Sequence, residues 1–135
     1  MQNIQIKPIG RIKNNFDRQP PRRKSWEDVI SKIIIKSEFS ECLEGLERYS
    51  HIVVLYWMDK FDLGVIGFPL GTFANRSPLR PNPVGLTIVE LISRNRNTLV
   101  VRGLDAYNDS PVIDIKPYTG HPKDLILSFR SPDRF

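Results

Sequence analysis

The chain has 135 residues, a formal net charge of +5 and a single cysteine. This length fits one domain spanning 1–135 and leaves no room for separate catalytic and recognition domains. Cys42 cannot form an intramolecular disulfide, the longest apolar run (52–58) is too short to cross a bilayer, and the first residues do not read as a signal peptide. We therefore expect a cytoplasmic protein that has no membrane partner.

Periodicity predicts strands over most of the chain. Isoleucines alternate with polar residues near the start, β-branched residues dominate 29–35, and 51–58 is a continuous apolar and aromatic run. Within that run, Tyr56 and Trp57 are more typical of core aromatics than of base-stacking platforms. The predicted strands are 4–9, 29–35, 51–58, 84–92, 98–104, 112–115 and 125–129.

Only residues 40–48 (SECLEGLER) predict a helix. Ser40 is a typical N-cap, Leu43 and Leu46 share a face, and Gly45 keeps the helix short. Cys42 is expected on the core side of this helix, as a structural thiol rather than a nucleophile. Short strands at near-regular spacing with one minor helix indicate an all-β fold, a small single-domain β-barrel with long loops.

The positive charge is concentrated in two blocks. Residues 1–24 carry seven Lys or Arg against one acid and residues 71–102 carry five against one, whereas residues 25–70 carry four against eight. Two basic blocks on a small domain favour a polyanion such as RNA, because phosphate neutralisation provides most sequence-independent affinity. A solvated basic surface that only maintains solubility explains the charge equally well.

Two common kinds of site are disfavoured. His51 and His121 have no cysteine or carboxylate at metal-ligand spacing, so we expect no metal. The glycines are scattered and form neither a dinucleotide-binding nor a phosphate-binding loop pattern, which argues against a Rossmann-type cofactor site.

Residues 76–87 (RSPLRPNPVGLT) predict a stiff, non-helical segment, called the strap below. Its three prolines each fix φ, remove a backbone donor and favour extended geometry in the preceding residue. Such rigidity suits the display of polar side chains to a ligand, and Gly85 would let a backbone or a cofactor approach closely. In the alternative interpretation, Arg80 and Asn82 only cap neighbouring strand ends.

A second stretch, 104–118 (LDAYNDSPVIDIKPY), places a turn of small polar residues before a strand. Asp114 and Lys116 project to the same side of that strand, two residues apart. They either form an ion pair that braces the barrel or line a ligand site.

These two stretches, together with PRR at 21–23 and LEGLERYSHIVVLYW at 43–57, resemble the TsaA-like, or TrmO, family. The hallmark segments of that family run much like ATRSPxRPNPIGL and DGTPVLDIKPY. The resemblance extends from the first strand to about Tyr118. It implies a homodimeric β-barrel that uses S-adenosylmethionine to methylate N6 of threonylcarbamoyladenosine beside the tRNA anticodon.

The resemblance also implies the residues of a cofactor site. The matching positions are Pro21, Arg22, Arg23, Asp59, Lys60, Arg76, Leu86, Asn108, Asp109, Ser110 and Pro111. The chain departs from the family pattern at Arg23, where the family has Gln, and at Asn108, where it has an acidic residue. Asp59 and Lys60 replace a pair that contains His, and the loop at 61–70 is shorter than in many members.

Methyl transfer from a sulfonium requires mainly positioning and the exclusion of water. In this scheme Arg76 binds the cofactor's carboxylate. Asp114, Lys116 or Tyr118 receives the proton lost from N6, unless orientation alone suffices. The expected tRNA contacts are Lys13, Arg18, Arg80 and Asn82. Two alternatives stay open, a methyltransferase of this fold that acts on another RNA or a small molecule, and a cofactor- or RNA-binding module without turnover.

Overall fold

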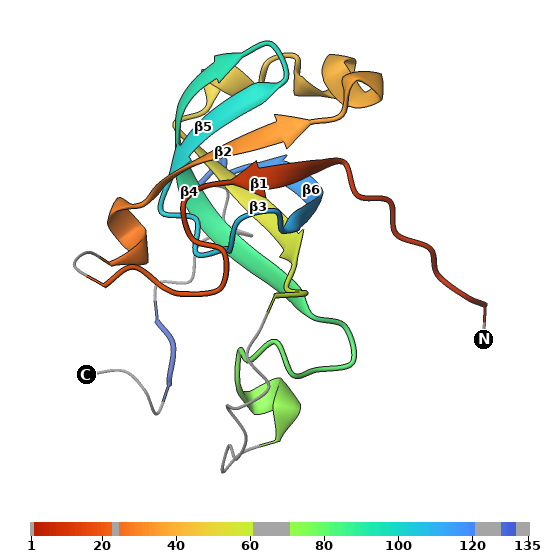
Figure 1. Cartoon of the computed structure of the whole chain (residues 1–135), viewed down its shortest axis with the longest axis vertical. Coiled ribbons are helices and arrows are strands. Elements are labelled where there is room, and N and C mark those ends of the chain that lie inside the picture. Colours follow the sequence, from red (N-terminus) through yellow and green to blue (C-terminus); the bar gives the residue numbers. More distant parts are fainter. Residues whose placement is uncertain (1, 23–24, 61–70, 121–127, 132–135) are drawn as a thin grey trace.

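The computed structural model describes residues 2–22, 25–60, 71–120 and 128–131, and Figure 1 shows them as a barrel with long loops at its ends. The barrel is closed, with strand order β1-β2-β5-β4-β3-β6. All neighbouring strands are antiparallel, so the predicted all-β barrel is confirmed. The strands are β1 (Gly10–Lys13), β2 (Ile30–Ile35), β3 (His51–Trp57), β4 (Val84–Asn95), β5 (Thr98–Arg102) and β6 (Pro111–Pro117).

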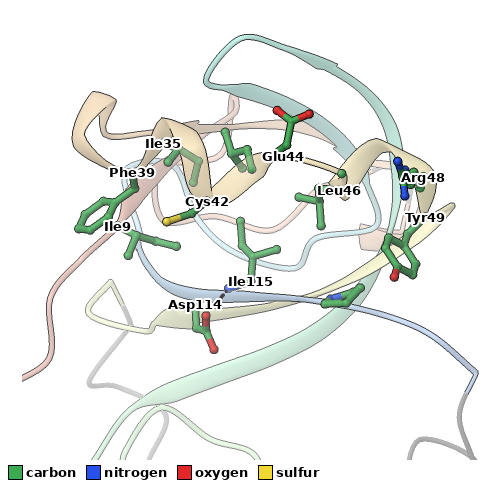
Figure 2. Close-up of a pocket in the computed structure, with 13 residues that line it drawn as sticks. Ile9, Ile35, Phe39, Cys42, Glu44, Leu46, Arg48, Tyr49, Asp114 and Ile115 are labelled. Atoms are coloured by element: carbon green, nitrogen blue, oxygen red, sulfur yellow. Dashed lines mark hydrogen bonds between the residues drawn. The ribbon is translucent and has the colours of Figure 1, made fainter.

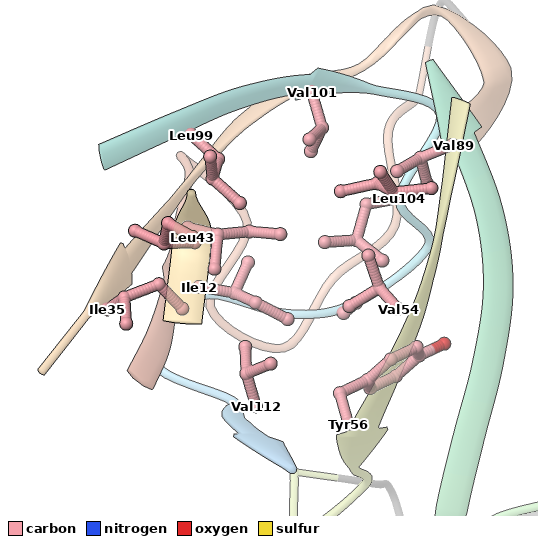
Figure 3. Packing of buried hydrophobic residues seen from close by; sticks show 13 residues of the cluster. Ile12, Ile35, Leu43, Val54, Tyr56, Val89, Leu99, Val101, Leu104 and Val112 are labelled. Atoms are coloured by element: carbon pink, nitrogen blue, oxygen red, sulfur yellow. The ribbon is translucent and has the colours of Figure 1, made fainter. Parts of the chain in front are cut away.

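Alternation along the strands separates a sealed interior from an outer surface. In β2, Ser31 and Ile33 are buried whereas Ile30 and Lys32 are exposed. The buried side chains meet inside the barrel (Figure 3), where removal of their apolar surface from water stabilises the fold. They are Ile12, Ile33, Ile35, Leu43, Ile52, Val54, Tyr56, Val89, Leu99, Val101, Leu104, Ala106 and Val112.

The barrel closes through a short joint between β1 and β6. These strands pair at two register positions, whereas β3 and β4 pair at seven. Backbone bonds on both sides extend the joint. Ile12 N–H donates to the Ser110 carbonyl at 3.0 Å, Asp109 N–H donates to the Ile12 carbonyl at 2.7 Å, and Ile9 N–H donates to the Val112 carbonyl. The turn before β6 is therefore fixed directly to β1.

The predicted strand at 4–9 is wrong. The first strand begins at Gly10, and Ile4 and Ile6 are 86% and 48% exposed. Their alternation does not mark a buried face, and Pro8 has no backbone donor for a ladder. Ile9 contacts the barrel through its N–H, which donates to the Val112 carbonyl at 2.8 Å. The strand predicted at 125–129 lies largely outside the described residues.

The predicted helix at 40–48 is present as two 3₁₀ segments, η2 (Ser37–Leu43) and η3 (Leu46–Arg48). Gly45 separates them in the left-handed conformation, at φ 86°. Leu43 joins the core, but Cys42 is exposed. The core position predicted for Cys42 is therefore wrong, because 3₁₀ geometry distributes side chains differently from the 3.6-residue period assumed.

Two more 3₁₀ segments lie in the loops, η1 (Trp26–Asp28) and η4 (Thr72–Ala74). In Figure 1, η4 and the start of the strap project beyond one end of the barrel, while η2 lies at the other end. Among the described residues, no helix has the length and apolar character needed to cross a membrane.

Candidate functional site

Asn108 fixes the turn before β6 to the loop that follows β1. Its side-chain oxygen accepts the N–H of Asn14 at 3.0 Å, and its side-chain amide donates to Asp17 Oδ1 at 3.0 Å. Its backbone N–H donates to the Phe16 carbonyl at 2.7 Å. The turn thereby positions the loop that leads to the 21–23 segment.

Asp109 is the centre of a cluster of cations. Its backbone is left-handed, at φ 69°, and its carboxylate accepts a hydrogen bond from Lys13 Nζ. Arg11 and Lys60 donate to its carbonyl at 2.8 and 3.3 Å. The bond from Lys13, reinforced by the nearby positive charges, holds the pKa of the Asp109 carboxyl below its usual value. A predicted RNA contact, Lys13, and a predicted cofactor contact, Lys60, thus meet at one turn.

The strap hydrogen-bonds to itself and to Asn75, the residue before it. Asn75 Oδ1 accepts the N–H of Ser77 at 2.9 Å, and Ser77 Oγ accepts the N–H of Leu79 at 3.1 Å. Arg80 Nη1 donates to the carbonyls of Asn75 and Ser77 at 3.0 and 3.1 Å. Arg80 therefore braces the strap through carbonyls of the loop, and these two bonds do not reach the strand ends named in the capping interpretation.

Arg76 has a different environment. Its side chain is exposed, and its Nη2 donates to the Leu86 carbonyl at 3.1 Å. A guanidinium has five donors, so this bond leaves capacity for an anionic ligand. Its charge also reaches Tyr56, where it partly opposes the rise in the pKa of that hydroxyl.

Tyr56 connects the barrel interior to Asp105. Its ring is 4% exposed, and its hydroxyl donates to Asp105 Oδ1 at 2.9 Å. The Thr87 hydroxyl donates to the same oxygen. Burial, together with the Asp105 carboxylate, raises the pKa of Tyr56 well above its ordinary value. The Tyr56 hydroxyl therefore orients Asp105 by donating to its carboxylate.

Gly85 lies directly opposite Tyr56 in the β3–β4 register. A Cβ on Gly85 would lie 2.4 Å from Cζ of the Tyr56 ring. A side-chain ring, and not the backbone or cofactor that the sequence predicted, therefore makes the close approach to Gly85.

A cavity of about 150 Å³, called the motif cavity below, brings the two sequence stretches together. Pro78 of the strap, Ser110 of the turn and Lys60 after β3 all line it. The other lining residues are Trp26, Tyr56, Met58, Asp105, Ala106 and Tyr107. Trp26 packs edge-to-face on Tyr107 with ring centroids 5.8 Å apart. Aromatic rings, an ammonium and a carboxylate therefore surround one space.

Comparison with known proteins assigns this arrangement to a family. Residues 11–122 match the TrmO_N family, described as the tRNA-methyltransferase O N-terminal domain. The chain belongs to the TrmO_N family. The matched residues include the strap, the turn before β6 and the lining of the motif cavity, and the resemblance found in the sequence is confirmed.

Relatives and solved structures agree with TrmO_N membership. An S-adenosyl-L-methionine-binding protein of Archaeoglobus fulgidus is 44% identical over 123 residues, which cover 84% of this chain and 88% of that protein. The tRNA (adenine(37)-N6)-methyltransferase of Homo sapiens is 30% identical, covering 86% of this chain and 30% of that protein. The crystal structure of TrmO from Pseudomonas aeruginosa aligns with a TM-score of 0.81 at 28% identity, covering 99% of this chain. The chain spans 64% of that structure.

In this TrmO_N chain the predicted cofactor residues do not all gather in one place. Lys60 and the 108–111 turn lie at the motif cavity or beside it. Pro21 and Arg22 belong to the 15–22 loop, which lines a separate surface hollow, and Arg23 lies outside the described residues. Leu86 points outward from β4 and is 47% exposed.

The predicted catalytic candidates lie toward the other end of β6. Lys116 Nζ and Asp114 Oδ2 form an ion pair at 2.9 Å, as the bracing interpretation expects. A second cavity, of about 520 Å³, lies between β6 and the η2 and η3 segments. Figure 2 shows Ile115 pointing into this cavity and the Asp114 carboxylate pointing away from it. Tyr118 follows β6, and its N–H donates to the His51 carbonyl at 3.1 Å.

The remaining predicted RNA contacts are surface residues. Arg18 is exposed in the 15–22 loop. Asn82 is exposed and borders a shallow hollow that also contains Trp57. Neither residue lines the motif cavity.

Several side chains of the site were not predicted from the sequence. Asp105 lies in the quoted 104–118 stretch, three residues before Asn108, but nothing in the pattern points it toward Tyr56. Trp26 and Asn14 fall in irregular segments without periodicity. Their roles arise from contacts between loops, and a family resemblance that names ligand-contacting positions does not reveal such supports.

Proposed function

We propose that the chain is an S-adenosylmethionine-dependent methyltransferase that acts on N6 of an adenosine in tRNA, the threonylcarbamoyladenosine beside the anticodon. The observation that carries this proposal is the motif cavity, where the strap and the turn before β6 meet. TrmO_N membership and the named activity of the human relative support the reaction. The name of the Archaeoglobus fulgidus relative, an S-adenosyl-L-methionine-binding protein, supports the cofactor. Because its substrate is a tRNA, we place the protein in the cytoplasm.

The residues in and near the motif cavity suit the chemistry of this cofactor, which carries a carboxylate, an ammonium group and an adenosine. Lys60 in the lining, and Arg76 outside it, whose charge reaches Tyr56 of the lining, offer cations for the carboxylate. Asp105 offers an acceptor for the ammonium group or for ribose hydroxyls. Trp26 and Tyr107 offer aromatic surfaces for the adenine.

A second copy of the chain is proposed to complete the site. The motif cavity is about 150 Å³, below the roughly 300 Å³ at which small-molecule sites begin. On the outer face of β3 and β4, Leu86 and Ile88 are each 47% exposed, opposite Leu55 and Val53. This apolar strip suits a two-fold contact. In such a homodimer, Leu86 of one copy would border the cavity of its partner, which explains its outward position.

The bound cofactor supplies a methyl group already activated by the positively charged sulfur. The chain's residues then have to hold N6 in line with that carbon and exclude water. Asp105 is a carboxylate in the cavity lining, and the hydroxyls of Tyr56 and Thr87 fix its direction. We assign the proton that leaves N6 to Asp105, because Asp114 borders the other cavity.

Mass spectrometry of tRNA nucleosides tests the reaction. Cells that lack the gene should lose the N6-methylated nucleoside, the wild-type gene should restore it, and Asp105→Asn should not. Titration calorimetry with S-adenosylmethionine tests the cofactor independently. Absence of binding heat and of thermal stabilisation at saturating cofactor would reject the methyltransferase. Cofactor binding without any change in tRNA nucleosides would indicate another RNA or a small-molecule substrate.

Light scattering tests the shared site. We expect the mass of two chains at micromolar concentration. The mass of one chain, unchanged by the cofactor, would reject the two-copy site while leaving the chemistry open to the nucleoside measurement.

A further inference from the structure

The outer surface of β1, β2 and β5 carries a set of cations that the proposed chemistry does not use. On β2 and just after it, alternate residues face outward, so two lysines and two isoleucines share one row at 30–36. Cations of the neighbouring strands extend this row sideways. We define the basic face as Arg11, Lys13, Lys32, Lys36 and Arg102.

The strand register places these cations side by side. Lys13 lies directly opposite Lys32. Arg102 lies opposite Ile30, two residues before Lys32. Directly opposed side chains have Cβ atoms roughly 5 Å apart, and like charges at this separation destabilise a sheet. The barrel tolerates this repulsion, which an anionic ligand would relieve.

Carboxylates neutralise the basic face only in part. Lys13 pairs with Asp109, and Arg102 Nη1 contacts Glu90 Oε2 at 3.1 Å. Within the described ranges, no ion pair involves the other three members of the face, Arg11, Lys32 and Lys36. A net positive surface therefore remains.

The basic face leads to the motif cavity, and its β1–β2 part stays clear of the proposed dimer contact. Lys13 contacts Asp109, whose neighbour Ser110 lines the cavity. In the closed strand order, neither β2 nor β5 is adjacent to β3. A dimer formed through the outer face of β3 and β4 would therefore leave the β1–β2 part of the basic face open.

We propose that the basic face binds the phosphate backbone of the tRNA whose adenosine enters the motif cavity. This proposal rests on the proposed function and adds the surface along which the RNA lies. Phosphate contacts position a nucleic acid without reading its sequence. Ile30 and Ile34, which are 52% and 42% exposed, place apolar side chains between the cations, where ribose can pack.

The double variant Lys32→Ala/Lys36→Ala tests the proposal in the full chain. Loss of two phosphate contacts should lower tRNA affinity roughly ten-fold at physiological salt and reduce the slope of log K against log salt by about 1.4 to 1.8. The affinity for S-adenosylmethionine should not change. Fluorescence anisotropy with labelled tRNA over a salt series gives both tRNA quantities, and calorimetry gives the cofactor affinity.

Two control variants separate position from net charge. Arg48→Glu removes the same two units of charge at η3, where Arg48 borders the other cavity, and should leave the salt slope near the wild-type value. Lys32→Arg/Lys36→Arg keeps the charges and should bind tRNA like the wild type. Both lysines are exposed, so circular dichroism and the Tm should show a folded barrel for every variant.

The outcomes distinguish this proposal from the proposed function. Equal tRNA affinity and salt slope for the wild type and the double alanine variant would overturn the basic face and leave the methyltransferase intact. A wild-type protein that binds neither tRNA nor cofactor would overturn both. Binding to vesicles of anionic phospholipid, lost in the double variant and without tRNA binding, would assign the face to a membrane surface and also overturn the proposal.

Discussion

The Tyr56 ring occupies the space that a side chain at position 85 would take. Because Gly85 has no Cβ, the hydroxyl end of the ring lies against Gly85 and its hydroxyl reaches Asp105 at the edge of the motif cavity. A glycine inside a strand normally weakens it. Here the glycine sets the position of the phenol that orients a candidate catalytic carboxylate.

Gly85→Ala should therefore destabilise the barrel and disturb the site together. The added Cβ would lie 2.4 Å from the ring, and overpacking of this kind typically costs about 1–3 kcal/mol. Urea denaturation should show the loss in the free energy of unfolding, and cofactor affinity should fall because the Tyr56 hydroxyl shifts from Asp105.

Gly71→Ala is the matched control for this prediction. Gly71 has φ −62°, and a Cβ there would meet nothing within 4 Å, so its stability should stay near the wild-type value. Unchanged stability and cofactor affinity in Gly85→Ala would show that the ring can move away at no cost, contrary to the packing described.

Lys13→Ala should raise the pKa of Asp109 toward its ordinary value, because the hydrogen bond from Lys13 is the main cause of its depression. A carboxyl with a depressed pKa in the folded state adds stability above its unfolded pKa, and that contribution is lost as pH falls through the folded value. The variant should therefore lose less stability between neutral pH and about pH 3 than the wild type. NMR titration of the Asp109 carboxyl carbon measures the pKa directly.

Lys32→Ala is the comparison for this titration, since Lys32 is opposite Lys13 but is not among the groups that lower the Asp109 pKa. An equal rise in the two variants would mean that the general positive field, and not the Lys13 bond, controls this carboxyl.

Asn108→Ala should loosen the loop that leads to the 21–23 segment. Two side-chain hydrogen bonds, with Asn14 and Asp17, are lost, and each is typically worth about 1 kcal/mol. Hydrogen exchange should become faster at Phe16 and its neighbours. Asn15→Ala, at an exposed position of the same loop, should leave exchange unchanged. Identical exchange in both variants would indicate that the backbone bond from residue 108 to Phe16 alone holds the loop.

Arg76→Ala and Arg80→Ala should affect different properties. Loss of a charge-assisted contact to the cofactor carboxylate in Arg76→Ala should weaken cofactor binding roughly ten-fold or more with little change in Tm. Arg80→Ala removes two bonds that hold the strap, one to Ser77 and one to Asn75 just before it, so the amides of Ser77 and Leu79 should exchange faster. If both variants bind cofactor alike, the assignment of Arg76 to the ligand and Arg80 to the strap is wrong.

The barrel could be predicted from the sequence because its strands coincide with local patterns of apolar residues. Alternation at 29–35 and the apolar run at 51–58 match β2 and β3 closely. The strap was also predictable, because proline restricts the backbone wherever it occurs. Contacts between loops carry no such signal, and for that reason the Tyr56–Asp105 bond and the role of Asn108 appear only in the structure.

The errors have local causes as well. Alternation at Ile4 and Ile6 looks like a strand but has no partner strand to pair with among the described residues. The core position predicted for Cys42 assumes an α-helical period, whereas η2 is a 3₁₀ segment. The residues of 104–118 are continuous in the sequence, but a strand advances about 3.3 Å per residue, so the two ends of the stretch lie far apart. Ser110 of the turn before β6 and Ile115 within β6 therefore line different cavities.

The short joint between β1 and β6 couples the motif cavity to the closure of the barrel. It has two register positions, extended by the bonds of the 109–110 turn to Ile12, and we expect local opening of the barrel to begin at this short pairing. A ligand that binds to this turn stabilises the β1–β6 pairing, because its binding free energy adds to the free energy needed to separate the two strands. Ligand binding in the motif cavity should therefore slow hydrogen exchange at the backbone amides of β1.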